Sequence, residues 1–160
     1  MNNRSKIKNG ILCVLAGCAL TACNSHVVFD DNTNIAQAAW SKEEAVAMMV
    51  PITDTLSHCA IYVNLRHNED YLYDNIFLEV IAVSPKGARV SDTLEYRLAD
   101  ERGKWFGQSG GQWYDCRLPF RSDVQFSTSG TYLFYIRQLM RQDALPGVGS
   151  VGLRVVKMKD

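Results

Sequence analysis

The sequence predicts an all-β protein, an antiparallel β-sandwich of jelly-roll type that follows a short N-terminal leader. Apolar and polar residues alternate with a period of two along much of the chain after residue 23, as on half-buried strands. Short segments rich in glycine, proline and serine separate these stretches, and signals for helices are scarce. About nine short strands in one domain favour two packed antiparallel sheets.

The leader has the composition of a secretory signal. Residues 1–10 carry three basic side chains and no acid, and residues 11–20 are almost all apolar or small. This apolar run is about half of the roughly 20 residues that a bilayer-spanning helix needs. We therefore expect a signal peptide that is removed, and not a transmembrane segment.

Residues 20–23 (LTAC) resemble the lipobox of bacterial lipoproteins. The resemblance implies that the sulfur of Cys23 is diacylated, that the chain is cleaved before Cys23, and that the new amine is acylated. Residues 15–18 (LAGC) also fit, but cleavage there would leave an apolar core of about seven residues, the lower limit for a signal peptide. Cys23 is therefore the predicted lipidation site and membrane anchor.

Residues 1–22 are thus expected to be a lipoprotein signal peptide, and residues 23–160 a single lipid-anchored domain. Removing the leader leaves 14 basic and 17 acidic side chains where the full chain has 17 of each, so the net charge falls from zero to −3. Because such a domain has no basic patch, we exclude nucleic acid as a partner.

The residues after Cys23 bear on where the anchored protein lies. Surface-exposed lipoproteins of the Bacteroidetes type, which this leader resembles, commonly carry an acidic cluster directly after the lipidated cysteine. Here Asn24 and Ser25 follow, and the first acids are Asp30 and Asp31. The aspartate at position 24 that marks inner-membrane retention in some proteobacteria is also missing. We expect an outer-membrane lipoprotein that faces the periplasm.

In chain order, the first half of the domain is expected to form four strands. Short apolar stretches at His26–Phe29 and Ala45–Val50 give the first two, separated by a capping signal for one helical turn at residues 41–44. Residues 59–66 alternate as on a half-buried strand. Residues 75–83 are almost continuously apolar, which predicts a central strand covered on both faces.

Five further strands are expected in the second half. Residues 93–98 alternate clearly, and Thr131–Ile136 resembles 75–83 in its continuous apolar character. The remaining three strands are Trp113–Leu118, Val124–Ser127 and Val151–Met158, and residues 137–144 carry a second signal for one helical turn. The turn signals between strands are Ser84–Gly87, Ser109–Gly111, Ser129–Gly130 and Pro146–Gly147.

Two cysteines remain in the mature domain, Cys59 and Cys116. A disulfide between them would persist outside the cytoplasm. Each also falls on a predicted strand, where a buried free thiol would fit equally well. The sequence leaves both interpretations open.

The sequence predicts no enzyme, cofactor or metal. His26, His58 and His67 lie far apart without metal-ligand spacing, and the neighbours His58 and Cys59 would point to opposite faces of a strand. Residues 107–111 are rich in glycine but precede a strand, so they lack the helix N-terminus that binds phosphate. Acids near strand ends are suitable calcium ligands, although no Asp-x-Asp-x-Asp spacing supports such a site.

Aromatic residues gather in or beside two predicted loops, Asp70–Phe77 and Asp100–Gly111. Exposed rings there would contact a partner protein or stack on a glycan, whereas buried rings would close the ends of the core. The second interpretation is the more usual one in sandwiches. The candidate partner or ligand surface consists of Tyr71, Tyr73, Asn75, Asp100, Trp105 and Trp113.

Three groups of segments together resemble the GldH gliding-motility lipoproteins. Residues 65–78 (LRHNEDYLYDNIFL) carry that family's spaced arginine, asparagine and paired tyrosines. Its Asp-Thr, Leu-Ala-Asp and glycine–tryptophan blocks correspond to residues 92–110, and its C-terminal pattern corresponds to residues 130–154. The resemblance covers essentially the whole chain.

This resemblance implies a non-enzymatic lipoprotein needed for surface gliding in some Bacteroidetes, where the gliding apparatus is linked to the type IX protein secretion system. It implies a scaffold or assembly factor whose partners are other envelope proteins of that machinery. The alternative is a carbohydrate-binding module of a glycan-processing envelope assembly, which would use Trp105, Trp113 or the Tyr71/Tyr73 pair.

Overall fold

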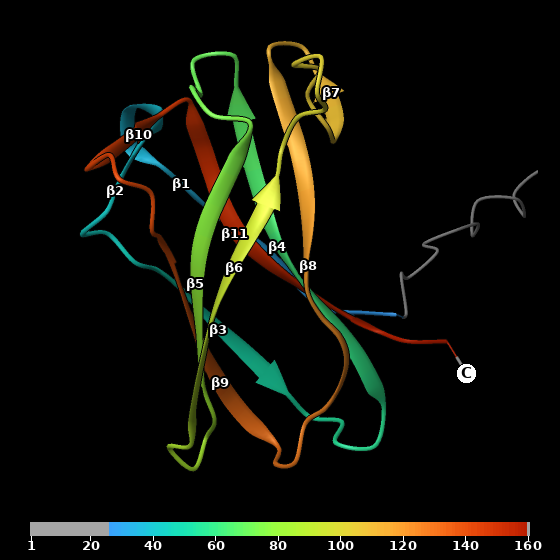
Figure 1. The fold of residues 1–160 in the computed structure, drawn as a ribbon. Helices are drawn as coiled ribbons and strands as arrows, with labels where there is room; N and C mark the ends of the chain where they lie inside the picture. Colours follow the sequence, from blue (N-terminus) through green and yellow to red (C-terminus); the bar gives the residue numbers. More distant parts are fainter. Residues whose placement is uncertain (1–25, 160) are drawn as a thin grey trace, which may run out of the picture.

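The computed structural model describes residues 26–159. The expected signal peptide at residues 1–22 and the lipidation site at Cys23 lie outside the described residues. Two antiparallel sheets pack face to face (Figure 1), which confirms the predicted all-β sandwich. Among residues 26–159, no helix is long and apolar enough to cross a membrane.

The strands vary from three to 13 residues in length. They are β1 (Val27–Asn34), β2 (Ala39–Ser41), β3 (Val46–Ile52), β4 (His58–Asn68), β5 (Asn75–Val83), β6 (Arg89–Arg97), β7 (Gln108–Gly110), β8 (Trp113–Gln125), β9 (Gly130–Gln138), β10 (Ala144–Pro146) and β11 (Val148–Lys157), with a short 3-10 turn, η1, at Ala36–Ala38.

The strand order is that of a jelly roll. One sheet has the order β1-β11-β4-β8-β7 and the other β3-β9-β5-β6, while β10 and β2 form a separate pair. Without the three-residue strands β2, β7 and β10, the long strands counted along the chain run 1-8-3-6 in one sheet and 2-7-4-5 in the other. Successive long strands therefore mostly alternate between the sheets, as in two Greek keys folded together.

The structure differs from the predicted elements in three respects. Strand β8 (Trp113–Gln125) joins the strand expected at 113–118 to the start of the one expected at 124–127 and ends before Phe126. The three-residue strands β2, β7 and β10 are not predicted, because so short a segment carries no periodicity. No helix forms at 41–44 or 137–144. Residues 41–44 make a single turn, in which the Glu44 N–H donates to the Ser41 carbonyl at 3.1 Å, and residues 137–138 instead continue β9.

Alternate side chains of both sheets form the core. On β3, Val46, Met48, Val50 and Ile52 are buried and the residues between them are exposed. Trp40 is fully buried at one side of the core, and its indole N–H donates to the Glu44 carbonyl at 2.9 Å. Each fully buried aliphatic side chain contributes about 1.5–3 kcal/mol relative to an exposed one.

The prediction that residues 75–83 are covered on both faces is wrong. In the described residues nothing packs on the outer face of the four-stranded sheet, where the Phe77 side chain is 36% exposed. Ile81, Val83 and Tyr135 instead shelter one another beside Arg89 and Arg137 in a shallow hollow of about 240 Å³. A continuously apolar strand therefore need not be packed against other elements on both of its faces.

The two ends of the sandwich carry different features. The register places Val27 opposite Val156, and Val156 opposite Ala60, so the described chain enters where β4 begins, and we call this the anchor end. Residues 68–74 and 98–114 lie at the other end, the loop end, drawn at the top of Figure 1. Because β4 has 11 residues, the two ends are about 30 Å apart.

Candidate functional site

Four aromatic rings meet at the loop end, those of His67, Tyr71, Trp105 and Tyr114. They come from the end of β4, from the loop after it, from the segment after β6 and from the start of β8. The His67 ring centroid lies 4.6 Å from Trp105 in an edge-on arrangement, 5.5 Å from Tyr114 in a stacked one, and 5.7 Å from Tyr71. The register sets this cluster, because His67 on β4 pairs with Tyr114 on β8.

His67 acts as a neutral aromatic ring in this cluster. Its side chain is fully buried, and this burial lowers the pKa of the imidazole below its usual range. Nδ1 lies 3.3 Å from the Asn68 carbonyl and so carries the proton, while Nε2 has no hydrogen-bond partner among the described residues. A buried lone pair is tolerable in the neutral form, whereas a buried imidazolium would be costly.

Tyr71 belongs to the core and is not available to a partner. It is 2% exposed, its hydroxyl donates to the Asn75 carbonyl at 2.8 Å, and burial raises its pKa. The half-buried Tyr73 packs edge-on against Tyr71 at 5.9 Å and donates to Gln142 Oε1 at 3.1 Å. For these two rings the structure supports the interpretation that aromatics close the end of the core.

Asn75 and Asp100 also have structural partners. The Asn75 amide donates to Glu95 Oε1 at 2.6 Å across the β5–β6 pair. Asp100 Oδ1 accepts the backbone N–H groups of Lys104 at 2.9 Å and Arg102 at 2.8 Å, and these bonds lower the pKa of the carboxyl group. Asp100 therefore caps its own turn.

A groove of about 370 Å³ opens beside the ring cluster. Its lining residues are Glu69, Gly103, Lys104, Trp105, Gly107, Ser109 and Tyr114. The lining includes the half-buried Trp105 ring and the Tyr114 hydroxyl, which donates to Glu69 Oε1 at 3.4 Å. Gly107 lets this segment pack closely on β8, because its φ is +95° and a Cβ there would lie 2.6 Å from the Asp115 carbonyl oxygen.

Trp113 lies outside this groove. Its ring covers Gly149, where a Cβ would approach to 2.5 Å, and the Arg66 guanidinium lies 5.6 Å from the ring centroid. Of the predicted surface residues, only Trp105 lines the groove. Glu69 and Lys104 were not singled out by the sequence, since placing them requires the strand register.

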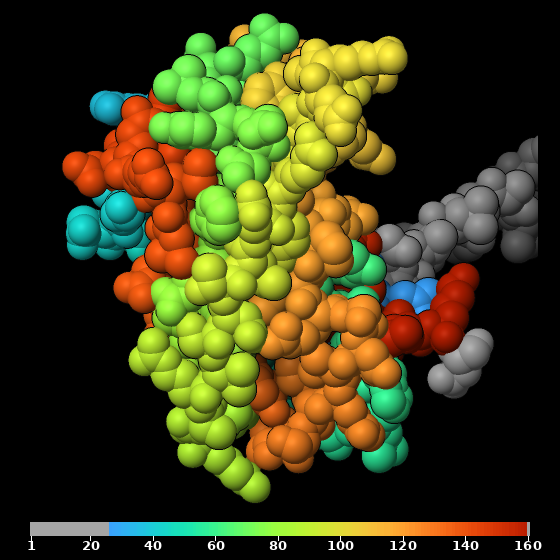
Figure 2. Space-filling model, viewed as in Figure 1, coloured from blue at the N-terminus to red at the C-terminus, as the bar shows by residue number. Residues whose placement is uncertain are grey.

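The groove offers aromatic faces and both signs of charge, but no catalytic set that we can identify. Among the described residues, no three His, Cys, Asp or Glu side chains are grouped as metal ligands. Two exposed apolar side chains lie on the loops that contribute to the groove, Leu72 at 66% and Phe106 at 47%. The loops are joined by backbone bonds from Leu98 and Ala99 to the Asp74 carbonyl and lie side by side in Figure 2. The two loops thus present aromatic, apolar and charged groups on one surface.

The disulfide between Cys59 and Cys116 is not formed, and both side chains are buried free thiols. Cys59 pairs with Val124, whereas Cys116 pairs with Leu65 further along the same ladder. Six residues of strand separate these two positions by about 20 Å, against the 4.4–6.8 Å between Cα atoms that a disulfide requires. Burial raises the pKa of the Cys116 thiol to about 11.

Comparison with known proteins gives the family. The sequence pattern of GldH lipoproteins matches residues 27–155, from the first described strand to the last. This chain belongs to the GldH lipoprotein family. The resemblance found in its motifs is confirmed.

Two relatives extend this result over most of the chain. The gliding motility lipoprotein GldH of Flavobacterium johnsoniae is 32% identical over 157 residues, which cover 94% of this chain and 97% of that protein. The gliding motility lipoprotein GldH homolog of Christiangramia forsetii is 31% identical over 144 residues, 86% of this chain and 88% of its own. Both alignments therefore span most of this chain and most of each relative.

Proposed function

We propose that this protein is a non-enzymatic lipoprotein of the gliding-motility envelope machinery that holds a partner protein at its loop end. The observation that carries the proposal is the Trp105 groove, together with the exposed Leu72 and Phe106 on the same two loops. Its family and the gliding motility lipoproteins that it resembles support the setting. The partners belong to the same machinery and the associated type IX secretion system.

The position of the groove supports a role as a scaffold. A lipid anchor at Cys23 would hold the anchor end of the sandwich near the outer membrane. The groove lies about 30 Å away along β4. A partner in the periplasm would then meet the loop end first.

The chemistry of the loop end favours a protein over a glycan. Leu72 and Phe106 are exposed apolar side chains on loops, where binding residues often lie, and aromatic residues such as Phe106 are enriched at protein interfaces. A glycan-binding platform would use several exposed rings, but Tyr71 is buried and Trp113 lies outside the groove. The glycan alternative therefore depends on Trp105 and Tyr114, beside the polar Glu69 and Ser109.

A photo-crosslinking amino acid placed in living cells tests the proposal. Introduced in place of Phe106, it should form a discrete adduct with an envelope protein. The matched control replaces Met49, which is 69% exposed on the outer face of the four-stranded sheet. Both variants should melt at the temperature of the native protein, because neither side chain is buried.

Two results would contradict the proposal. One is the absence of an adduct at position 106 from folded, correctly anchored protein. The other is an identical adduct pattern at positions 106 and 49. Retardation of the protein on a peptidoglycan or polysaccharide gel that Trp105→Ala abolishes would support the glycan alternative instead.

A further inference from the structure

The described chain begins very near the predicted anchor. His26 follows Cys23 by three positions, and three residues span at most about 10 Å even when extended. The His26 carbonyl accepts the backbone N–H of Lys157 at 2.7 Å, and the Met158 N–H donates to the His58 carbonyl at 2.8 Å. The anchor end of the sandwich thus begins directly after the short segment from Cys23 to His26, which we call the tether.

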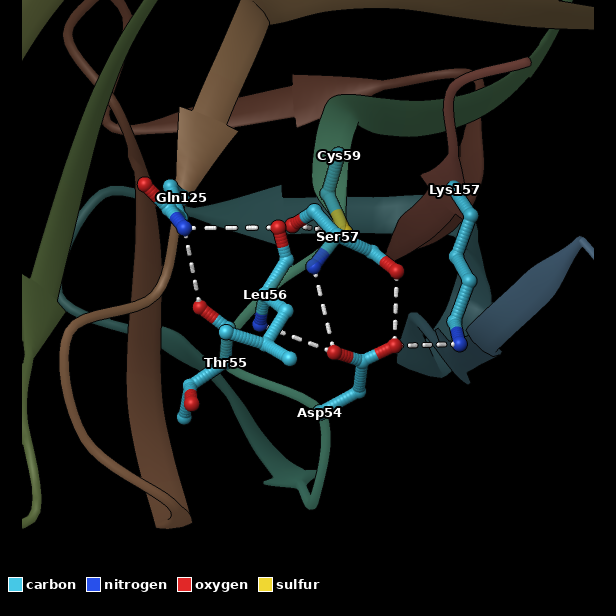
Figure 3. A network of polar contacts seen from close by, with 7 residues as sticks. All are labelled: Asp54, Thr55, Leu56, Ser57, Cys59, Gln125 and Lys157. Atoms are coloured by element: carbon cyan, nitrogen blue, oxygen red, sulfur yellow. Dashed lines mark hydrogen bonds and ion pairs between the residues drawn. The ribbon is translucent and has the colours of Figure 1, made fainter. Parts of the chain in front are cut away.

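An exposed leucine is held rigidly at the same end. Leu56, in the loop between β3 and β4, is 82% exposed, and Met158 is 44% exposed. Asp54 fastens the loop, as Figure 3 shows: Oδ1 accepts the N–H groups of Leu56 at 2.9 Å and Ser57 at 3.1 Å, and Oδ2 accepts the Lys157 ammonium at 2.6 Å. The loop therefore presents Leu56 to its surroundings in a defined position.

Gln125 secures the other side of this loop. Its amide donates to the Thr55 carbonyl at 3.2 Å and to the Leu56 carbonyl at 3.3 Å (Figure 3). The backbone of residues 54–57 is thus tied both to β8 and, through Lys157, to the end of β11. Hydrogen bonds on both sides of Leu56 therefore fix the conformation of this loop.

Two carboxylates at this end have polar partners. The hydrogen bond from the Lys157 ammonium is the main reason why the pKa of Asp54 is lowered, so this ion pair persists in weakly acidic conditions. Asp123 Oδ1 lies 2.6 Å from His58 Nδ1. Lys159 adds an exposed positive charge beyond Met158. The Lys157 and Lys159 ammonium groups favour contact with anionic headgroups, and the acidic Asp160 that follows them opposes it.

We infer that the anchor end lies against the lipid surface, with Leu56 and Met158 among the headgroups. The inference rests on the proposed lipid anchor at Cys23. A tether of three residues leaves no space for another protein between this end and the bilayer. The contact fixes the orientation of the sandwich, so that the groove at the loop end faces away from the membrane.

Fluorescence quenching in liposomes tests this orientation. The acylated protein, as cells produce it, is reconstituted into vesicles of phosphatidylethanolamine and phosphatidylglycerol whose acyl chains carry bromine. A small thiol-reactive fluorophore is attached to Leu56→Cys, to Met158→Cys and to the control Leu72→Cys, which is 66% exposed at the loop end. Labelling of the native protein corrects for Cys59 and Cys116, which are buried.

We expect strong quenching at positions 56 and 158 and none at 72. Equal quenching at 56 and 72 would overturn the orientation. Flotation of the vesicles separates the two possible failures. Protein that floats without quenching at 56 contradicts only the orientation, whereas protein that does not float contradicts the anchor as well.

Lengthening the segment between Cys23 and His26 tests whether Leu56 and Met158 bind lipid themselves or are only held near it by the short tether. A flexible glycine–serine insertion of about ten residues between Asn24 and Ser25 lets the domain move away from the bilayer. If Leu56 and Met158 bind the lipid surface themselves, quenching at 56 persists in this variant. Its loss would show that only the short tether holds this end near the membrane, and would overturn the proposed contact.

Discussion

Single residues at the loop end show why burial decides the role of a side chain. Tyr71 and Asp100 both have side chains of the kind found at binding sites, and the sequence places both in loops. In the structure the Tyr71 ring is part of the core and the Asp100 carboxylate caps its own turn. The sequence favoured rings that close the core, but which ring is buried depends on how distant strands align. The Asp100 cap is local, because its partners are the N–H groups of Arg102 and Lys104.

The buried His67 should make stability depend on pH. Its pKa is lowered in the folded state, so below the ordinary value near 6.5 the unfolded chain binds more protons than the folded one. His67 then costs stability progressively as the pH falls from about 6.5 through the folded pKa. Thermal melts from pH 7.5 to 5 should show a falling melting temperature.

Replacing the ring tests whether His67 is the group responsible. His67→Phe keeps an aromatic ring in the cluster but cannot be protonated, so it should flatten the dependence of the melting temperature on pH. The control His26→Gln changes an exposed histidine and should leave the slope unchanged. An unchanged slope in His67→Phe would contradict the assignment.

The strands show how far periodicity predicts structure. Alternation located the long strands of both sheets, because one face of each is buried. It did not locate the single strand β8, which passes through Pro119. Proline cannot donate to the ladder, but Pro119 pairs with Tyr62 at an irregularity in the register, where the missing N–H is tolerated. The groove could not be predicted either, because its residues come together only through the register of β4 and β8.

Adjacent methionines on β3 give a direct test of the register between β3 and β9. Met48 is 4% exposed and Met49 is 69% exposed, and their Cα partners on β9 are Phe134 and Leu133. Met48→Ala should lower the free energy of unfolding by about 2–5 kcal/mol, as truncations in a core do. Met49→Ala should change it by less than about 0.5 kcal/mol. Urea unfolding of the two variants measures both values, and a reversed order would contradict the register.

At the scale of the whole molecule, the jelly roll places the anchor end and the loop end at opposite ends of the long strands. The chain enters and leaves at the anchor end, drawn at the right of Figure 1, because β1 and β11 are neighbours and antiparallel. The loops that carry the groove fall at the other end of the same sheet. The sequence predicted the sandwich and the lipid anchor, but this separation emerges only from the order of the strands.

The anchor itself is the last prediction. Cys23 has the longer apolar run before it, so Cys23→Ser should abolish incorporation of radiolabelled palmitate, while Cys18→Ser should leave the label in place. The unacylated Cys23→Ser protein should also leave the membrane fraction, because stable anchoring needs two or more acyl chains.

Protease digestion of cells tests which side of the outer membrane the domain faces. If the protein faces the periplasm, protease added to intact cells should leave the acylated domain whole and should digest it only after the outer membrane is permeabilised. Label that survives in Cys23→Ser and disappears in Cys18→Ser would move the anchor five residues upstream and lengthen the tether to the sandwich. Digestion in intact cells would place the domain on the cell surface, where its groove would meet partners outside the cell.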